Sequence, residues 1–358
     1  MKKIIITGGA GFIGSALIRY LINKKLTILN LDKLTYSGNL DNLKNFVTKK
    51  KYSFIKVDIQ NSKKVSKIIE DYQPDFIFNL AAETHVDRSI DNPISFIKTN
   101  IFGTYTLLES ARKYWNNLSP HKKSKFRFLH ISTDEVYGDL KNNRKFFSET
   151  TSYMPSSPYS SSKASSDHLV SAWYRTYGLP TIITKCSNNY GPFQYPEKLI
   201  PLIILNALDY RKLPVYGSGN QIRDWLHVND HVKALWLIIN KGQIGQSYNI
   251  GGNNQKKNIE VVKKICVYLD KHIKPKKKSK IKSYFDLVRY VKDRPGHDFR
   301  YAINCNKLKK ELNWYPEYNF SSGLEDTVLW YRENINWCKK ILKKGFIYKK
   351  RLGLNERP

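Results

Sequence analysis

The sequence predicts an α/β protein with a doubly wound parallel sheet, followed by a smaller and irregular C-terminal domain. Short β-branched runs alternate with longer helical patterns through the first half, which indicates a parallel sheet covered by helices on both faces. A glycine string follows the first run, and the second half is rich in proline and glycine. With 358 residues, at roughly 150 residues per domain, the chain has room for two domains or one large α/β unit.

The individual elements of the first half follow from these runs. We expect helices at 15–23, 62–72, 102–115 and 160–177, and strands at 3–7, 27–32, 53–58, 76–81, 126–132 and 181–186. Past about Tyr190 the alternation ends, although an apolar helix expected at 231–240 could return to the first domain. Ligands of such sheets bind outside the carboxyl ends of the strands, so the chemistry is expected there.

Composition excludes several classes of protein. Hydrophobic residues make up 41% and aromatic residues 13% of the chain, which is too apolar for a disordered protein. No apolar run approaches the roughly 18 residues of a membrane span, and the first apolar run ends at Gly8 without a signal-peptide cleavage site. The four cysteines are far apart and form no C-x-x-C pair, so we expect a cytoplasmic protein without a zinc module.

The charge of the chain is strongly positive, with 61 Lys and Arg against 30 Asp and Glu, a net charge of +31. Such a balance raises the possibility of nucleic acid, an anionic membrane or another polyanion as partner. However, the lysines are scattered, and the densest block, at 274–282, reads as an exposed loop without the interleaved arginines and aromatics of nucleic-acid surfaces. We therefore expect neither a nucleic-acid nor a membrane partner.

A phosphate-binding loop is predicted directly after the first strand. The segment at 7–14 reads Thr-Gly-Gly-Ala-Gly-Phe-Ile-Gly, and Gly8, Gly11 and Gly14 have the spacing G-x-x-G-x-x-G. Glycine permits the tight turn and the close approach of a pyrophosphate, and the following helix offers free N–H groups. Because the string lies between a strand and a helix, we prefer this interpretation to a plain glycine-rich turn.

An acidic residue ends the second strand and completes the dinucleotide signature. Asp32 lies eighteen positions after Gly14, where a carboxylate can accept hydrogen bonds from ribose hydroxyls and would repel a 2′-phosphate. This favours NAD over NADP, although a surface Asp at the start of a turn is the alternative. Asp58, at the end of the third strand, is expected either to contact the adenine or to cap the next helix. The domains are therefore predicted as an NAD-binding Rossmann domain at 1–186, rejoined by about 224–250, and a mainly substrate-binding domain at 187–358.

Two further patterns carry chemistry. Tyr159 and Lys163 lie four residues apart at the start of a helix and so share a face. A lysine ammonium and a nicotinamide cation would lower the pKa of the tyrosine, so that it could act as the base in an alcohol oxidation. The fifth strand ends in Thr133, Asp134 and Glu135. Thr133 can hydrogen-bond the reacting sugar oxygen. Two adjacent acids suggest one acid and one base, as needed to eliminate water, unless they only cap the next turn.

These residues resemble the extended short-chain dehydrogenase/reductase family, and within it the dTDP-glucose 4,6-dehydratase group. The resemblance runs from Lys3 to about Tyr331 and includes the motifs at 32–36, 83–89, 133–135, 187–192, 196–201, 223–225 and 293–297. Two departures are small: Thr84 stands where Ser is usual, and the stretch at 138–149 is short, which affects a surface loop.

The resemblance implies tightly bound NAD, regenerated in each turnover, and a product that is a 4-keto-6-deoxy sugar nucleotide, of the kind that supplies deoxysugars such as rhamnose for cell-surface polysaccharide. It implies that Tyr159, with Lys163, takes the C4 hydroxyl proton, that Glu135 takes the C5 proton, and that Asp134 protonates the departing C6 hydroxyl. The implied cofactor residues are Gly8, Gly11, Phe12, Ile13, Gly14, Asp32, Lys33, Leu34, Thr35, Asp58, Ile59, Ala81, Thr99, Tyr159, Lys163 and Asn189. The implied substrate residues are Thr84, Thr133, Asn188, Lys198, Leu199, Arg223, Asn258, Asp293, Arg294, Pro295, Gly296 and His297.

Several alternatives stay open at this point. Arg223 suits a sugar-nucleotide diphosphate, but a surface pair with Asp224 would explain it equally from the residues alone. His85 and His297 are more often structural, and no metal site is expected, because the histidines and cysteines do not cluster. A homodimer through the helices at 102–115 and 160–177 rests on the resemblance. The rival functions are a nucleotide-sugar 4-epimerase, a decarboxylase of the same family, and a basic, non-catalytic protein that binds polyanions.

Overall fold

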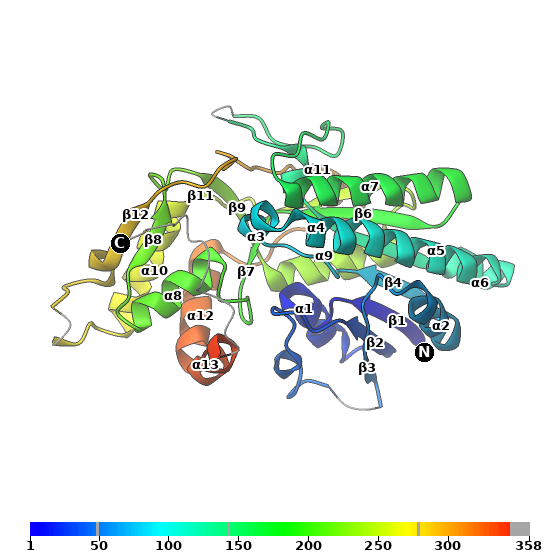
Figure 1. The fold of residues 1–358 in the computed structure, drawn as a ribbon, viewed down its shortest axis with the longest axis horizontal. Coiled ribbons are helices and arrows are strands. Elements are labelled where there is room, and N and C mark those ends of the chain that lie inside the picture. Colours follow the sequence, from blue (N-terminus) through cyan, green and yellow to red (C-terminus); the bar gives the residue numbers. More distant parts are fainter. Residues whose placement is uncertain (48–49, 142–143, 278–279, 344–358) are drawn as a thin grey trace.

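The structure is a computed structural model that describes residues 1–47, 50–141, 144–277 and 280–343. Its largest feature is a seven-stranded sheet with the strand order β10-β6-β5-β4-β1-β2-β3 (Figure 1). Every pair of neighbouring strands is parallel. The strands are β1 (Lys2–Thr7), β2 (Leu26–Asp32), β3 (Tyr52–Lys56), β4 (Phe76–Asn79), β5 (Arg127–Thr133), β6 (Thr181–Cys186) and β10 (Ser247–Ile250).

Helices cover both faces of this sheet, because its central strands are apolar on both sides. Ile4, Ile5 and Ile6 of β1 are completely buried, with Ile4 and Ile6 in one core and Ile5 in the other. The first core is closed by α1 (Phe12–Leu21), α9 (Val228–Lys241) and α11 (Asn306–Leu312), and the second by α2 (Ser62–Tyr72), α5 (Gly103–Asn116) and α7 (Pro158–Tyr177). The predicted fold class, a doubly wound parallel sheet, is confirmed.

Several predicted elements have different ends in the structure. The strand expected at 76–81 ends at Asn79, because the chain turns away where the Ala81 N–H meets the Thr7 hydroxyl at 3.1 Å. The strand expected at 53–58 ends at Lys56. The helix expected at 102–115 is preceded by a π-helical turn, η2 (Ile97–Phe102). The helix expected at 160–177 begins at Pro158, because Ser157 and Ser160 form a capping box.

The second half forms two small sheets and a separate helical core. One sheet contains β7 (Asn188–Tyr190), β9 (Ile222–His227) and β11 (Gln255–Lys257), and the other pairs β8 (Leu213–Tyr216) with β12 (Val288–Val291). A core around Ile203, Leu269 and Tyr331 is built by α8 (Leu199–Leu208), α10 (Asn258–His272), α12 (Phe320–Glu333) and α13 (Ile335–Lys343). The short elements are η1 (Leu40–Asn42), α3 (Val86–Asp91), α4 (Pro93–Phe96), α6 (Pro120–Lys125), η3 (Asp134–Tyr137) and η5 (Tyr284–Leu287).

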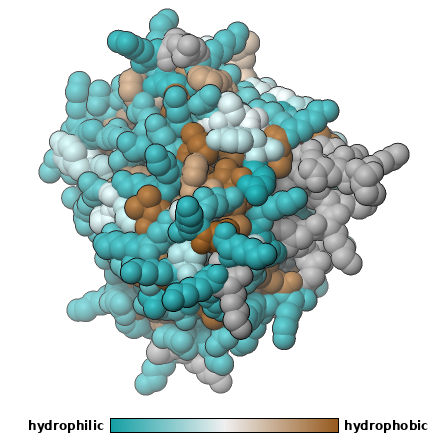
Figure 2. Space-filling view, turned by 90° about the vertical axis from the view of Figure 1, so that its left-hand side faces the viewer, coloured by the Kyte–Doolittle hydropathy of each residue, from teal (hydrophilic) through white to brown (hydrophobic). Residues whose placement is uncertain are grey.

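The chain crosses between the two regions more than once. After β9, helix α9 packs against α1, and β10 extends the large sheet beside β6. The elements α8, α10, α12 and β8 lie on the side of the molecule away from the N-terminus (Figure 1). Seen from that side, the surface is mostly hydrophilic, with small apolar areas near its centre (Figure 2). Lys274, Lys276, Lys277, Lys280 and Lys282 are exposed, while residues 278–279 of that basic block lie outside the described residues. The division of the chain at 186/187 stays a prediction.

Candidate active site

A cleft lies at the carboxyl ends of the large sheet, where the sequence predicts the site residues. Its wall is formed by the segments that follow β1, β2, β3, β4, β5 and β6, by the first turns of α7, and by residues 194–198. Most of the predicted residues lie in this wall: Gly8, Gly11, Phe12, Ile13, Gly14, Asp32, Lys33, Thr35, Asp58, Ile59, Ala81, Thr84, Thr99, Thr133, Asp134, Glu135, Tyr159, Lys163, Asn188, Asn189 and Lys198. The remaining ones lie outside it: Leu34, Leu199, Arg223, Asn258, Asp293, Arg294, Pro295, Gly296 and His297.

The glycines of the loop are constrained by the protein to different degrees. A Cβ atom at Gly14 would lie 2.2 Å from the Gly8 carbonyl oxygen, so this glycine is required by the loop itself. At Gly11, which lines the cleft, a Cβ atom would meet only that same oxygen, at 3.3 Å, a tight contact that a small shift would relieve. The protein thus constrains Gly11 less than Gly14, and the close approach of a ligand backbone such as a pyrophosphate gives a further reason for a glycine there.

Asp32 joins the glycine loop to the end of β2. Its two carboxylate oxygens accept N–H groups from Ala10, at 2.9 Å, and from Leu34, at 2.7 Å. Burial raises the pKa of Asp32, and these two hydrogen bonds act in the opposite direction. Leu34 does not line the cleft; its backbone N–H instead holds the Asp32 carboxylate in place. Each oxygen of Asp32 keeps a lone pair for a further donor such as a ribose hydroxyl.

The alternative role of Asp58 as a helix cap is wrong. The side chain of Asn61, not that of Asp58, caps α2 by accepting the Lys64 N–H at 3.0 Å. Asp58 instead forms an ion pair with Lys33 at 2.7 Å and accepts the Gln60 N–H at 3.0 Å. The pair brings together two predicted cofactor residues from the ends of neighbouring strands.

The Tyr159–Lys163 pair is buried at the cleft, with 7% of Tyr159 and 4% of Lys163 exposed. The Tyr159 hydroxyl hydrogen-bonds with the side chain of Thr133. The expectation of a lowered tyrosine pKa is wrong for the protein's own groups: burial raises the pKa of Tyr159 well above its usual value, and the charges of Glu135, Cys186 and Asp134 add to this. Burial also lowers the pKa of Lys163 to about 8.

Asp134 and Glu135 lie side by side in the first turn of η3, and neither caps it. The cap is Thr133, whose hydroxyl accepts the Glu135 N–H at 3.3 Å. Burial, followed by the charges of Glu135 and Asp224, raises the pKa of Asp134 well above its usual value. Burial also raises the pKa of Glu135, but the positive charges of Arg294, Arg223 and Lys198 oppose it. The environment therefore favours a protonated Asp134 and a more easily ionised Glu135.

Arg223 is not a surface residue paired with Asp224. Only 5% of it is exposed, and it donates to the carbonyl oxygens of Ile222, at 2.8 Å, and Asp298, at 2.8 Å. Asp224 turns to the other side of β9, where it accepts the N–H groups of Gly252 and Asn254. Successive residues of a strand point to opposite faces, which separates the two charges.

The other predicted residues outside the wall lie in two groups. Near β8, Asp293 pairs with His297 at 2.6 Å, and Arg294 pairs with Asp87 at 3.3 Å; the intervening Pro295 and Gly296 form the turn between them. Leu199 and Asn258 start α8 and α10. Lys198 reaches back from this side to donate to the Thr84 carbonyl oxygen at 3.0 Å. His85 caps α3 by accepting the Arg88 N–H at 3.3 Å, a structural role.

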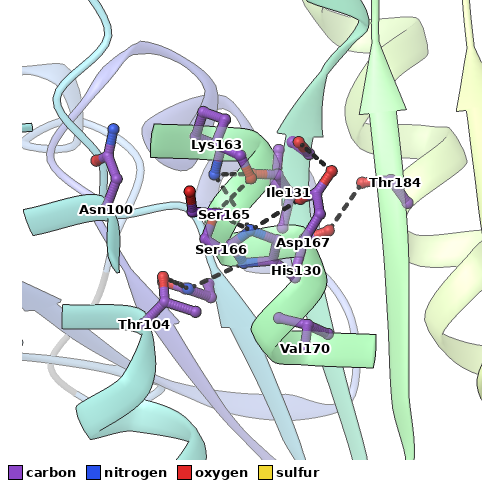
Figure 3. Close-up of polar contacts among 12 residues, drawn as sticks. Asn100, Thr104, His130, Ile131, Lys163, Ser165, Ser166, Asp167, Val170 and Thr184 are labelled. Atoms are coloured by element: carbon purple, nitrogen blue, oxygen red, sulfur yellow. Dashed lines mark hydrogen bonds and ion pairs between the residues drawn. The ribbon is translucent and has the colours of Figure 1, made fainter. Parts of the chain in front are cut away.

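Two features of the site were not found from the sequence. Glu197 in the wall accepts the Tyr36 hydroxyl at 2.9 Å and pairs with Arg88 of α3 at 3.4 Å, which links two loops and a helix around the cleft. Behind the cleft, His130 contacts both Lys163 and Asp167 in a buried polar cluster (Figure 3). The only sequence signal for the latter is a histidine inside an otherwise apolar strand, Phe128 to Ile131.

Within the described residues, no three His, Cys, Asp or Glu side chains are placed to hold a metal ion. The helices of that same part of the chain include none that is long and apolar enough to cross a lipid bilayer.

The fold and the Tyr-Lys pair beside a glycine loop define a member of the extended short-chain dehydrogenase/reductases. The family model for GDP-mannose 4,6 dehydratase matches residues 5–327, so the chain belongs to this family. It is 56% identical to the dTDP-glucose 4,6-dehydratase of Shigella flexneri over 348 residues, 95% of each protein.

Solved structures of dehydratases have the same fold. The dTDP-glucose 4,6-dehydratase of Bacillus anthracis, in complex with NAD, is 46% identical, with a TM-score of 0.83 over 95% of this chain and 100% of that one. The enzyme of the same name from Streptomyces venezuelae, with NAD and TYD bound, is 38% identical, with a TM-score of 0.85 over 95% and 99%.

Proposed function

We propose that this protein is an NAD-dependent dehydratase that converts dTDP-glucose into dTDP-4-dehydro-6-deoxy-glucose and water. The observation that carries the proposal is the presence of the Tyr159–Lys163 pair and the Asp134–Glu135 pair in the wall of one cleft. The first pair suits oxidation of an alcohol, and the second suits removal of a proton and of water from neighbouring carbons. The identity to dehydratases over nearly the whole chain supports the same assignment.

The cleft fits NAD by the chemistry of its residues. Gly11 leaves room for a pyrophosphate beside the start of α1, and the Asp32 oxygens have lone pairs for ribose hydroxyls. The negative charge of Asp32 disfavours a 2′-phosphate, so NADP is not expected. When bound, NAD would take a hydride from C4 of the sugar and return it to C6, so that the reaction has no net redox change. The pKa of Tyr159, which burial raises, would be lowered by the positive charge of a bound nicotinamide.

Three side chains divide the proton transfers. Tyr159 takes the proton of the C4 hydroxyl, and Lys163 stabilises the phenolate. The resulting ketone acidifies C5, and Glu135 removes the C5 proton. Asp134 donates its proton to the C6 hydroxyl, which leaves as water. Glu135 then returns its proton to C5. Burial raises the pKa of both acids, but neighbouring negative charges add to the rise at Asp134, whereas positive charges oppose it at Glu135. This difference supports the division, since a general acid must start protonated and a general base must start ionised.

Positive charges near Glu135 support an anionic sugar nucleotide as substrate. Arg223, Arg294 and Lys198 act on the Glu135 carboxylate from the side of the second region. A diphosphate placed there would be held by guanidinium groups, which match phosphate oxygens in geometry. The roles of Thr84, Asn188, Asn258 and the 293–297 segment toward the substrate rest on the family resemblance.

The test is the mass of the product after incubation with dTDP-glucose. A dehydratase gives a product lighter by one water, whereas a 4-epimerase leaves the mass unchanged. A decarboxylase of this family would leave dTDP-glucose untouched, because this sugar carries no carboxylate. A non-catalytic polyanion-binding protein would give no product and would shift nucleic acid in a salt-sensitive manner. Unchanged dTDP-glucose after prolonged incubation with NAD would refute the proposal.

A homodimer through α5 and α7 is part of the proposal. Phe102, at the start of α5, and Tyr105 are 58% and 46% exposed, and Tyr177, at the end of α7, is 45% exposed. The two helices pack together, so these side chains form an apolar face that a second copy of the chain would cover. The four cysteines are free and buried, which supports a reducing, cytoplasmic location. Supply of deoxysugar such as rhamnose for cell-surface polysaccharide is the pathway we expect for the product.

A further inference from the structure

A buried polar cluster lies behind the cleft, between β5 and α7 (Figure 3). It contains Asn79, His130, Lys163 and Asp167, of which 1%, 1%, 4% and 1% are exposed. Only Lys163 reaches the wall of the cleft, and the mechanism proposed above uses none of the other three. Burying two charged groups and an imidazole together is costly unless their contacts are specific.

The hydrogen bonds of Asn79 determine which nitrogen of His130 carries the proton. The Thr7 hydroxyl accepts the Ala81 N–H and donates to Asn79 Oδ1 at 2.9 Å. The Asn79 amide nitrogen therefore faces His130 Nδ1, at 3.1 Å, and that ring nitrogen must accept. Burial, and then the charge of Lys163, lowers the pKa of His130 to about 4, so the ring is neutral and its proton is on Nε2.

The Nε2 atom of His130 lies at the meeting point of the cluster. It is 3.2 Å from Ser166 Oγ and 3.4 Å from Asp167 Oδ1, both of which can accept its proton. It is also 3.2 Å from Lys163 Nζ; because both nitrogens carry protons, this contact is not a hydrogen bond, and the Lys163 ammonium donates instead to the Ile131 carbonyl oxygen at 2.8 Å. The ring is thus fixed on both edges and sets how far the Lys163 ammonium can move away from the cleft.

Asp167 supplies the negative charge of the cluster. It lies one helical turn after Lys163 on α7, and its Oδ2 atom accepts the hydroxyls of Ser132 and Tyr153, each at 2.9 Å. Burial lowers the pKa of Lys163, and the Asp167 charge is the larger of the two influences that oppose it; the other is Cys186. The hydroxyls hold the carboxylate in place without neutralising it.

The other ionisable groups around Lys163 come from each element packed on α7. Strand β5 contributes His130. Strand β6 contributes Cys186 and Lys185, and Lys185 is also buried near Asp167. The turn η3 contributes Asp134 and Glu135, which act on Tyr159. The charges of Asp87 and Arg88 on α3 are paired with Arg294 and Glu197. The neighbouring α5 contributes the uncharged Thr104, whose hydroxyl accepts from Asn79 of the cluster, while Asn100 of η2 donates to Ser162 on α7.

We propose that Asp167 and His130 are positioning residues for the Tyr159–Lys163 pair: Asp167 keeps the buried Lys163 ammonium charged, and the His130 ring blocks its movement away from the cleft. Neither residue contacts the substrate. Their effect on the rate passes through Lys163, whose charge stabilises the Tyr159 phenolate. This inference rests on the proposed function insofar as the rate of dehydration is its readout.

The effect of the Asp167 charge on Lys163 is tested with Asp167→Asn, which removes the charge but keeps the shape of the side chain. A nearby opposite charge shifts a pKa by about 1–3 units, so losing it should move the basic limb of the kcat–pH profile to lower pH by about one unit or more. Above that limb, kcat should fall about tenfold or more relative to the wild type. Asp167→Glu, which retains the charge, should restore the limb. Tyr153→Phe, which removes a hydrogen bond to the same carboxylate but no charge, should leave the limb in place.

The role of His130 in positioning the Lys163 ammonium is tested independently with His130→Leu. This variant also keeps the proposal testable if Asp167→Asn does not fold. We expect kcat to fall about tenfold with the KM for dTDP-glucose within about twofold, and His130→Gln, whose amide keeps polar contacts, to regain most of the loss. An unchanged kcat in His130→Leu, or a basic limb in Asp167→Asn at the wild-type pH, would overturn the corresponding half of the proposal.

A direct titration separates this inference from the proposed function. The Lys163 Nζ signal can be followed in NAD-loaded protein labelled with ¹⁵N-lysine and identified by its loss in Lys163→Arg. If the wild type forms no product from dTDP-glucose, the proposed function fails, and the titration still decides the inference. A Lys163 pKa that is the same in the wild type and in Asp167→Asn contradicts it.

Discussion

Replacing Glu135 by glutamine should separate oxidation of the sugar from elimination of water. Glutamine is nearly isosteric with glutamate but cannot accept the C5 proton. General acid–base groups contribute about 10²–10⁴-fold, so overall turnover should fall by that range, about 3–5 kcal/mol in the activation free energy. Tyr159 is untouched by this change, so oxidation at C4 should continue and reduced nicotinamide should accumulate on the enzyme.

The structure also predicts how the pH dependence of sugar oxidation changes in Glu135→Gln. The Glu135 charge is, after burial, the largest influence that raises the pKa of Tyr159. Removing that charge lowers the tyrosine pKa, and the phenolate then forms at lower pH. The acid limb of sugar oxidation in Glu135→Gln should therefore lie at lower pH than the corresponding limb of the wild-type reaction.

The assay is the absorbance of reduced nicotinamide after rapid mixing with dTDP-glucose, measured across pH. Exchange of deuterium into C5 is the second measurement and should be lost in Glu135→Gln. Tyr159→Phe is the matched variant and should form no reduced nicotinamide, because the C4 hydroxyl proton has no acceptor. If Glu135→Gln abolishes its formation as fully as Tyr159→Phe does, Glu135 belongs to the oxidation step and the proposed division of roles is wrong.

Three further predictions concern the cofactor and the assembly. Asp32→Asn keeps an acceptor for the Ala10 or Leu34 N–H but loses the negative charge. It should weaken NAD binding about 10- to 100-fold in a titration, with little change in Tm. An unchanged NAD affinity would mean that Asp32 is a turn residue only. Gly11→Ala, whose Cβ would lie 3.3 Å from the Gly8 carbonyl oxygen, should lower Tm only slightly and bind NAD weakly. Gly14→Ala, whose Cβ would lie 2.2 Å from the same oxygen, should lower Tm by several degrees; equal effects of the two on Tm would contradict the assignment of Gly11 to the ligand. Phe102→Lys should convert a dimer to monomers in sedimentation velocity, while Val267→Lys, at an exposed apolar residue on α10, should not; a monomeric wild type would refute the proposed interface.

The parts of the fold that depend on local pattern could be predicted from the sequence. The six strands of the first half follow from β-branched runs, because a strand buried on both faces needs little else. Gly14 and Asp32 could be identified because their roles depend on their place along one strand–loop–helix unit. Strand ends depend on distant contacts: β4 ends at Asn79, and just beyond it the Ala81 N–H donates to the hydroxyl of Thr7, 74 positions away.

The properties that depend on packing could not be predicted. The direction of the Tyr159 pKa shift depends on burial and on Glu135, and sequence spacing shows only the neighbouring lysine. The pairing of Arg223 with Asp224 was a reasonable alternative until the strand placed them on opposite faces. The hydrogen bond between Tyr36 and Glu197 joins residues 161 positions apart, so no local sequence pattern predicts it.

The division of labour between Asp134 and Glu135 shows how packing can give different chemistry to neighbouring acids. In the unfolded chain the two carboxyl groups differ little. In the folded chain burial raises the pKa of both. At Asp134 the charges of Glu135 and Asp224 add to this rise more than Arg223 opposes it, while at Glu135 the charges of Arg294, Arg223 and Lys198 oppose it more than Asp298 adds. These positive charges come from segments 63 or more positions further along the chain. The second region therefore brings the charges that suit a diphosphate and, by the same placement, favours ionisation of the base that must act once the substrate has been oxidised.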